Sequence, residues 1–169
     1  MELYFLRHDI AAERGDPKYK DDSLRPLIPQ GREKMHRAAL GMQALGLKFD
    51  SILSSPYLRA RQTAEMVAQV YKLKNNTIHL TDTLLPPASI KKLLQEIHQH
   101  FPKSKNILLV GHEPHFTEMI SDLLQSDQPL NIDLKKGGLC CLKIRQDLNQ
   151  PNAELLWLLT PLQLELMSH

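Results

Sequence analysis

Apolar residues occur in this chain either as short continuous runs or at a spacing of three to four. Residues 3–6 and 107–110 are continuously apolar. Such runs are typical of strands that are buried on both faces of a parallel sheet. The sequence predicts strands over residues 2–7, 50–54, 77–80 and 106–110.

The periodic segments lie between these strands and predict amphipathic helices. They begin at Gln30, at Pro56, near Ile90 and near Glu113. Gly46 is expected to end the first helix, and Ser55 to cap the second with Pro56 in its first turn. Strands that alternate with helices predict an α/β fold, a three-layer α/β/α sandwich with a mostly parallel central sheet.

The C-terminal third departs from this alternation. Segments 139–144 and 154–159 read as strands with only a predicted turn at 149–152 between them, so we expect an antiparallel hairpin at the edge of the sheet. Residues 9–29 form a long loop, of the kind that is usually functional or mobile. Repeats and linkers are absent from the sequence, which predicts a single domain over residues 1–169.

Composition narrows the class of protein. Hydrophobic residues make up 42% of the 169 residues, and the net charge of +2 implies no general affinity for nucleic acid. We expect a cytoplasmic protein, because no secretory signal and no apolar run of membrane-spanning length is evident. Cys140 and Cys141 are adjacent and should point to opposite faces of a strand, which disfavours a disulfide between them.

Polar and cationic residues follow three of the predicted strands. They are Arg7-His8, the segment from Ser54 to Arg59, and Gly111-His112. The carboxyl ends of parallel strands meet at one edge of a sheet, where ligands bind in open α/β folds. Two arginines and two histidines at one place, with helices starting near residues 56 and 113, predict an anion site suited to phosphate.

These segments carry a resemblance to a known family. Leu6-Arg7-His8, the stretch 54–64 (SSPYLRARQTA) and Val110-Gly111-His112-Glu113-Pro114 resemble the histidine phosphatase superfamily, whose fold is phosphoglycerate-mutase-like. Segments 24–27 (LRPL) and 158–161 (LLTP) resemble its SixA-type phosphohistidine phosphatase branch. The resemblance spans nearly the whole chain, with the motifs in the family's order.

The resemblance implies a mechanism. His8 would attack phosphorus through Nε2 and form a phosphohistidine intermediate that water hydrolyses. His8 must then be neutral at Nε2, with its Nδ1–H donated to an acceptor such as a backbone carbonyl. Arg7, Arg59 and His112 would hold the phosphoryl oxygens. No cofactor and no metal are expected.

The acid that larger members of the superfamily use to protonate an alcohol leaving group is missing from its usual segment. In residues 81–89 the only acid is Asp82. A phosphorus–nitrogen bond to imidazole demands less proton donation, which favours phosphohistidine in a protein, such as a histidine-containing phosphotransfer domain. A small-molecule phosphomonoesterase remains an alternative.

Asp9 departs from the family pattern, which has glycine or sometimes alanine at this position. Its carboxylate could repel substrate, hydrogen-bond Arg7 or His8, donate a proton, or point into solvent. A phospho-binding regulatory module with impaired catalysis is therefore the third hypothesis.

Other polar residues have several interpretations. Arg25 either reaches the phosphate or forms an ion pair within the loop, whereas Arg61 is expected on the surface. Ser54 and Ser55 are expected as turn and cap residues rather than nucleophiles. His112 and His115 flank a proline without the spacing of a zinc protease, so a metal site is disfavoured.

Overall fold

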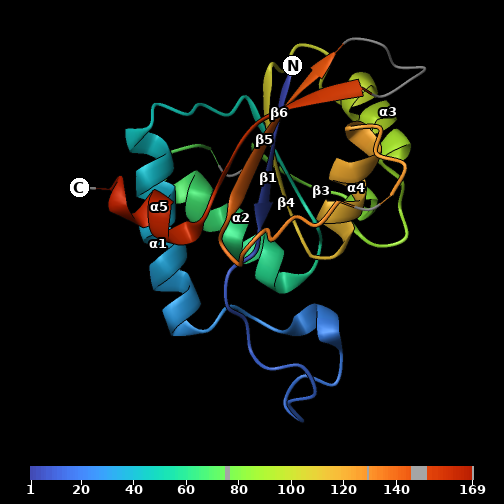
Figure 1. Cartoon of the computed structure of the whole chain (residues 1–169). Helices are drawn as coiled ribbons and strands as arrows, with labels where there is room; N and C mark the ends of the chain where they lie inside the picture. Colours follow the sequence, from blue (N-terminus) through green and yellow to red (C-terminus); the bar gives the residue numbers. More distant parts are fainter. Residues whose placement is uncertain (75–76, 129, 146–151, 169) are drawn as a thin grey trace.

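A six-stranded sheet with the order β3-β2-β4-β1-β5-β6 forms the centre of the fold in the computed structural model (Figure 1). The structure describes residues 1–74, 77–128, 130–145 and 152–168. The strands are β1 (Glu2–Arg7), β2 (Ser51–Ser54), β3 (Ile78–Leu80), β4 (Asn106–Gly111), β5 (Leu139–Arg145) and β6 (Asn152–Leu159). Strands β1 to β4 pair in parallel, whereas β5 and β6 form an antiparallel edge, as predicted.

Helices cover both faces of this sheet, which confirms the three-layer α/β/α sandwich (Figure 1). They are α1 (Pro29–Ala44), α2 (Leu58–Val70), α3 (Ile90–His100), α4 (His115–Leu123) and α5 (Pro161–Leu166), with 3-10 turns η1 (Asp22–Leu24) and η3 (Asp82–Leu84). Helices α1, α2 and α5 pack on one face and α3 and α4 on the other. None of the described helices combines the length and the apolar character that crossing a bilayer requires.

Alternation along the strands divides the core into two layers. In β1, Leu3 and Phe5 face α3 and α4, whereas Tyr4 and Leu6 face α1 and α2. The adjacent cysteines of β5 follow the same rule, since both are buried thiols on opposite faces and neither forms a disulfide.

Two predicted helix starts were wrong by two residues. Helix α2 begins at Leu58 after Tyr57, so Ser55 does not cap it. The N–H of Ser55 donates to Val110 O at 2.9 Å, so the chain continues to pair with β4 beyond the end of β2 before it turns. Helix α4 begins at His115 rather than at residue 113.

Helix α5 was not predicted, because six residues are too few to show a helical period. It begins with a capping box in which Thr160 and Gln163 exchange hydrogen bonds, and Pro161 occupies its first turn. The turn predicted over 149–152 lies outside the described residues except for Asn152, which begins β6.

Helix α5 docks closely on α1 at Gly41. A Cβ at Gly41 would collide with the backbone carbonyl of Leu164. We expect Gly41→Ala to lower the free energy of unfolding by about 1–3 kcal/mol, because backbone cannot move aside as a side chain can. Urea denaturation measures this, with Arg32→Ala on the exposed side of α1 as a control that should change it by less than about 0.5 kcal/mol. An equally stable Gly41→Ala protein would contradict the α1–α5 contact.

Candidate active site

Three neighbouring strands end at the same edge of the sheet and bring distant residues together. Strand β4 lies between β1 and β2, with Arg7 opposite Gly111 and Ser54 opposite Val110. The rings of His8 and His112 consequently lie with their centroids 5.0 Å apart. The convergence that the sequence predicted for these two histidines is therefore present.

His8 is fixed in one tautomer by its two neighbours. Its Nδ1 lies 2.7 Å from the carbonyl oxygen of Asp9, which only accepts, so Nδ1 carries the proton. Its Nε2 accepts the N–H of Arg59 Nε at 3.2 Å. The lone pair of Nε2 is thus directed at the guanidinium of Arg59.

Burial keeps both histidines neutral. Desolvation lowers the pKa of His8 to about 3, and the charges of Arg59 and Arg7 contribute while the Asp9 carbonyl opposes the shift. Desolvation likewise lowers the pKa of His112 to about 2, with further contributions from His8 and Arg59. At neutral pH the positive charge of the site therefore resides on its arginines.

Arg59 enters from the first turn of α2 and is held from several sides. Its Nη1 donates to Asp22 O at 2.7 Å and its Nη2 donates to Asp22 Oδ2 at 2.9 Å. The guanidinium carbon lies 4.9 Å from the centre of the Tyr57 ring, a cation–π contact. The side chain is only 7% exposed, so its orientation is set by the protein rather than by water.

The other two arginines make contacts with the loops. Arg25 donates from Nε to Asp22 Oδ1 at 2.8 Å and from Nη1 to Ala12 O at 2.6 Å, which is the ion pair within the loop that the sequence left open. Arg7 donates from Nη1 to Leu134 O at 2.9 Å. Its Nε is buried without a hydrogen-bond partner in the described part of the chain, so it has a donor to spare.

Ser55 contacts His112 directly. Its Oγ lies 2.8 Å from His112 Nε2 and accepts the N–H of Tyr57 at 3.3 Å. His112 Nδ1 is buried and has no partner among the described residues. The prediction that Ser55 caps a helix missed its contact with His112. The position of Ser55 directly after a predicted strand was the feature of the sequence that could have indicated this contact.

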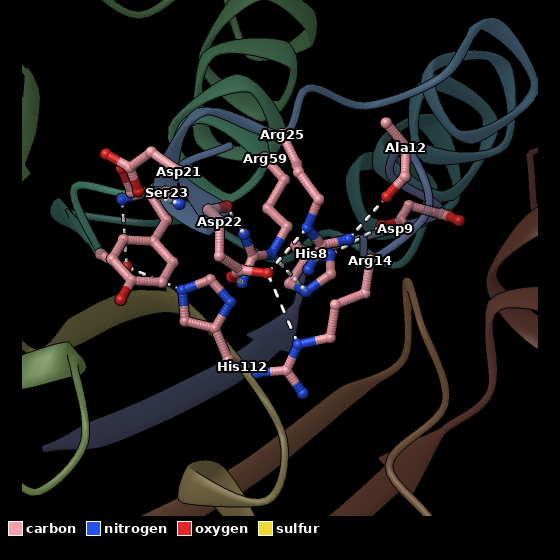
Figure 2. Close-up of polar contacts among 12 residues, drawn as sticks. His8, Asp9, Ala12, Arg14, Asp21, Asp22, Ser23, Arg25, Arg59 and His112 are labelled. Atoms are coloured by element: carbon pink, nitrogen blue, oxygen red, sulfur yellow. Dashed lines mark hydrogen bonds and ion pairs between the residues drawn. The ribbon is translucent and has the colours of Figure 1, made fainter. Parts of the chain in front are cut away.

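Asp22 was also missed by sequence reasoning. Figure 2 shows it among Arg59, Arg25 and Arg14, close to His8 and His112. It belongs to a loop with no periodic pattern, and the sequence offers no more than its position three residues before Arg25. Asp82, by contrast, is exposed at the start of η3, and in the described part of the chain it contacts no residue of the site.

Asp9 neither points into solvent nor contacts Arg7. It is 1% exposed, its Oδ1 accepts the N–H of Ile10 at 2.6 Å, and Oδ2 has no partner in the described residues. Figure 2 shows its carboxyl turned away from the His8 ring. The space it fills is left by Gly137, where a Cβ would lie 2.5 Å from Asp9 Oδ2. The contact with His8 is made by the Asp9 backbone carbonyl instead.

The structure also places Arg61, which was expected on the surface, and His115, which was considered as a metal ligand. Arg61 is exposed and pairs with Glu65 at 3.2 Å, as expected. His115 is buried at the start of α4, with Nδ1 3.7 Å from Glu118. Across residues 1–74, 77–128, 130–145 and 152–168, His, Cys, Asp and Glu side chains form no group of three that could hold a metal ion.

The comparisons with known proteins agree with this arrangement. The model of the histidine phosphatase superfamily (branch 1) matches residues 3–84. An uncharacterized protein of Picosynechococcus is 38% identical over 145 residues, 85% of each chain. The phosphohistidine phosphatase SixA of Escherichia coli K12 is 25% identical over 131 residues, 76% of this chain and 78% of SixA.

Solved structures share the fold. The protein histidine phosphatase SixA complexed with tungstate has a TM-score of 0.80 at 22% identity, covering 97% of this chain and 99% of that one. A structure described as a putative alpha-ribazole-5'-P phosphatase of Escherichia coli has a TM-score of 0.72 at 18% identity, covering 95% and 98%.

The chain belongs to the histidine phosphatase superfamily. Within that superfamily it belongs with the SixA-type proteins, as the resemblance of its motifs implied.

The neutral histidines lead to a first prediction for this site. We expect the imidazoles of His8 and His112 to remain neutral between pH 8 and pH 5, whereas both titrate near pH 6.5 in the urea-unfolded chain. Because their pKa values are lower when folded, they favour folding above pH 6.5, and this contribution declines as the pH falls. Nitrogen-15 chemical shifts of the two rings measure both states; protonation of either ring above pH 5 would contradict the arrangement.

Asp9 leads to a second prediction. Burial raises the pKa of its carboxyl, so the folded protein favours the protonated form and loses stability as the pH rises from the unfolded pKa through the folded one. Asp9→Asn cannot ionise. It should therefore melt at a higher temperature than the wild type at pH 7.5, by a margin that shrinks as the pH falls from the raised folded-state pKa of Asp9 towards its unfolded value.

Thermal unfolding of both proteins from pH 3.5 to 8 provides the measurement. Both chains keep the same histidines, so their contribution cancels in the difference. A wild type that is at least as stable as Asp9→Asn at pH 7.5 would show that the carboxyl has a partner that stabilises its charge.

Proposed function

We propose that this chain acts, as one domain over residues 1–169, as a phosphatase in which His8 Nε2 attacks phosphorus. The observation that carries the proposal is the pair of contacts at His8. The Asp9 carbonyl holds the proton on Nδ1, and the lone pair of Nε2 is directed at a buried arginine. The neutral ring thus carries its lone pair on Nε2 beside a buried cation, and the phosphoryl group replaces the N–H of Arg59 as the partner of that lone pair.

The reaction proceeds in two displacements. The phosphoryl group enters at the Nε2 side of His8, the N–P bond forms, and the bond to the leaving group breaks with its electron pair going to the leaving atom. Water then attacks phosphorus, the N–P bond breaks, and neutral His8 and inorganic phosphate are released. Asp82 does not supply the proton for the leaving atom, because its side chain is exposed at the start of η3.

Arg59, Arg7 and His112 bind the oxygens of the phosphoryl group. Arg59 supplies a buried positive charge next to Nε2, and Arg7 has a buried Nε–H that no described residue accepts. His112 is oriented by Ser55, and its Nδ1, which has no partner among the described residues, donates to a phosphoryl oxygen. Arg25 acts through Asp22 rather than on the phosphate, since two of its nitrogens bind loop oxygens.

The substrate that we propose is phosphohistidine in a protein, such as a histidine-containing phosphotransfer domain. Imidazole leaves readily without a protein acid, and no acid is held at the expected place. The similarity to SixA, a phosphohistidine phosphatase, supports the same substrate.

A small-molecule phosphomonoester is the second candidate, because a structure described as an alpha-ribazole-5'-P phosphatase shares the fold. A catalytically impaired binding module has less support, since the Asp9 carboxyl is turned away from His8.

Phosphate release from a phosphohistidine protein and from an aryl phosphate ester tests the function. We expect the first substrate to be turned over faster, and His8→Ala to lower its turnover by about 10³-fold or more. The matched control is His36→Ala, an exposed histidine on α1, which should retain wild-type rates. Rapid quenching should trap an acid-labile phosphoryl group on His8.

The outcomes separate the candidates. Faster turnover of the ester would favour the small-molecule phosphatase. Turnover of neither, with tungstate still bound, would favour the binding module. Full activity in His8→Ala would exclude His8 as the nucleophile.

A further inference from the structure

Asp22 is an acidic side chain inside a site built to bind an anion. It lies in η1 of the long loop, and its carboxylate touches Arg59, Arg25 and Arg14. A negative charge here opposes phosphate binding, so its presence requires a physical reason. The contacts of Arg59 supply one.

Resting on the proposed function, we propose that Asp22 is a positioning residue that holds one edge of the Arg59 guanidinium so that the opposite edge faces His8 and the incoming phosphoryl group. A guanidinium is a rigid plane with five N–H donors in fixed directions. The end edge, formed by Nη1 and Nη2, binds the backbone oxygen and the carboxylate of Asp22. Two contacts at one edge fix the rotation of the whole plane.

The edge that remains is the side edge formed by Nε and Nη2. Its Nε–H already points at His8 Nε2, at 3.2 Å. A phosphoryl group that arrives at Nε2 therefore meets two parallel N–H donors, the fork geometry that suits phosphate. Asp22 binds the end edge of the guanidinium, and the side edge stays available to the phosphoryl group.

Asp22 is itself anchored. Arg25 donates to its Oδ1 at 2.8 Å and also to Ala12 O at 2.6 Å. Ala11 and Leu27 form a bridge that closes the loop behind these contacts. A chain of polar contacts thus runs from Ala12 through Arg25, Asp22 and Arg59 to His8 (Figure 2).

The opposite view is that Asp22 is an internal competitor that occupies the place of phosphate. The two views predict opposite signs. If Asp22 competes, its neutral replacement tightens anion binding and raises the rate. If Asp22 positions Arg59, the neutral replacement lowers the rate even though a negative charge has been removed.

Asp21 offers a matched control for this test. It is the neighbouring acid in the same loop, its side chain accepts from the N–H of Ser23 at the start of η1, and asparagine serves equally well as a cap. Asp22→Asn and Asp21→Asn therefore remove the same charge from adjacent positions, but only the first removes a carboxylate that binds Arg59 and Arg25.

We expect Asp22→Asn to lower kcat on a phosphohistidine protein by about 10- to 100-fold, as misplacement of a catalytic group does. KM should change by less than about 3-fold, because anion attraction is not weakened by the loss of a negative charge. Asp21→Asn should stay within 2-fold of the wild type. A rate for Asp22→Asn that is unchanged or raised would overturn the proposal.

A second readout does not depend on turnover. In the wild type and in Asp21→Asn, the Nε–H of Arg59 should give a slowly exchanging nitrogen-15 NMR signal, because it is buried against His8. In Asp22→Asn this signal should exchange rapidly or disappear, while the methyl spectrum of the core stays unchanged. Persistence of this signal in Asp22→Asn would overturn the positioning role of Asp22, whatever the activity of the wild type. Failure of the wild type to hydrolyse either substrate would refute the proposed function alone.

Discussion

The hydrogen bond between His8 Nδ1 and the carbonyl of Asp9 determines the chemistry of this site. It consumes the one proton of the neutral ring and leaves the lone pair on Nε2, facing Arg59. A side-chain acceptor would titrate or rotate, but a backbone carbonyl at the end of a strand does neither. The tautomer of His8 is thus defined by the course of the main chain, since the acceptor is the backbone and not the side chain of Asp9.

The order of the strands supplies the rest of the arrangement. Because β4 lies between β1 and β2, the chain places His112 beside His8 and Ser55 beside His112, although these residues are far apart in sequence. The Asp9 carbonyl holds His8, Ser55 holds His112 and Asp22 holds Arg59. Burial then keeps the imidazoles neutral, so the positive charge of the site comes from arginines, whose protonation does not depend on pH in the neutral range.

Sequence reasoning recovered what periodicity and strand ends encode. The fold and the convergence of His8 and His112 followed from apolar runs and from the rule that ligands bind at the carboxyl ends of parallel strands. Asp22 could not be recovered, because its partners depend on how residues 9–29 cross the site, and an irregular loop has no period. The direction of the Asp9 side chain could not be predicted either, because it depends on the space beside Gly137, which is 128 positions away in the chain.

Two carboxyl groups near the site illustrate how the same charge has different consequences. Asp9 is buried, its Oδ2 has no hydrogen-bond partner in the part of the chain that the structure describes, and burial raises its pKa. For Asp22, burial also opposes ionisation, but the hydrogen bond from Arg25 and the charge of Arg59 outweigh it and hold the pKa of its carboxyl below the usual range. Asp22 therefore stays charged and binds Arg25 and Arg59, whereas the Asp9 side chain binds the N–H of Ile10. The acid that departs from the family pattern thus has no side-chain contact with the arginines of the site in the described residues, and the acid that binds them lies in the loop.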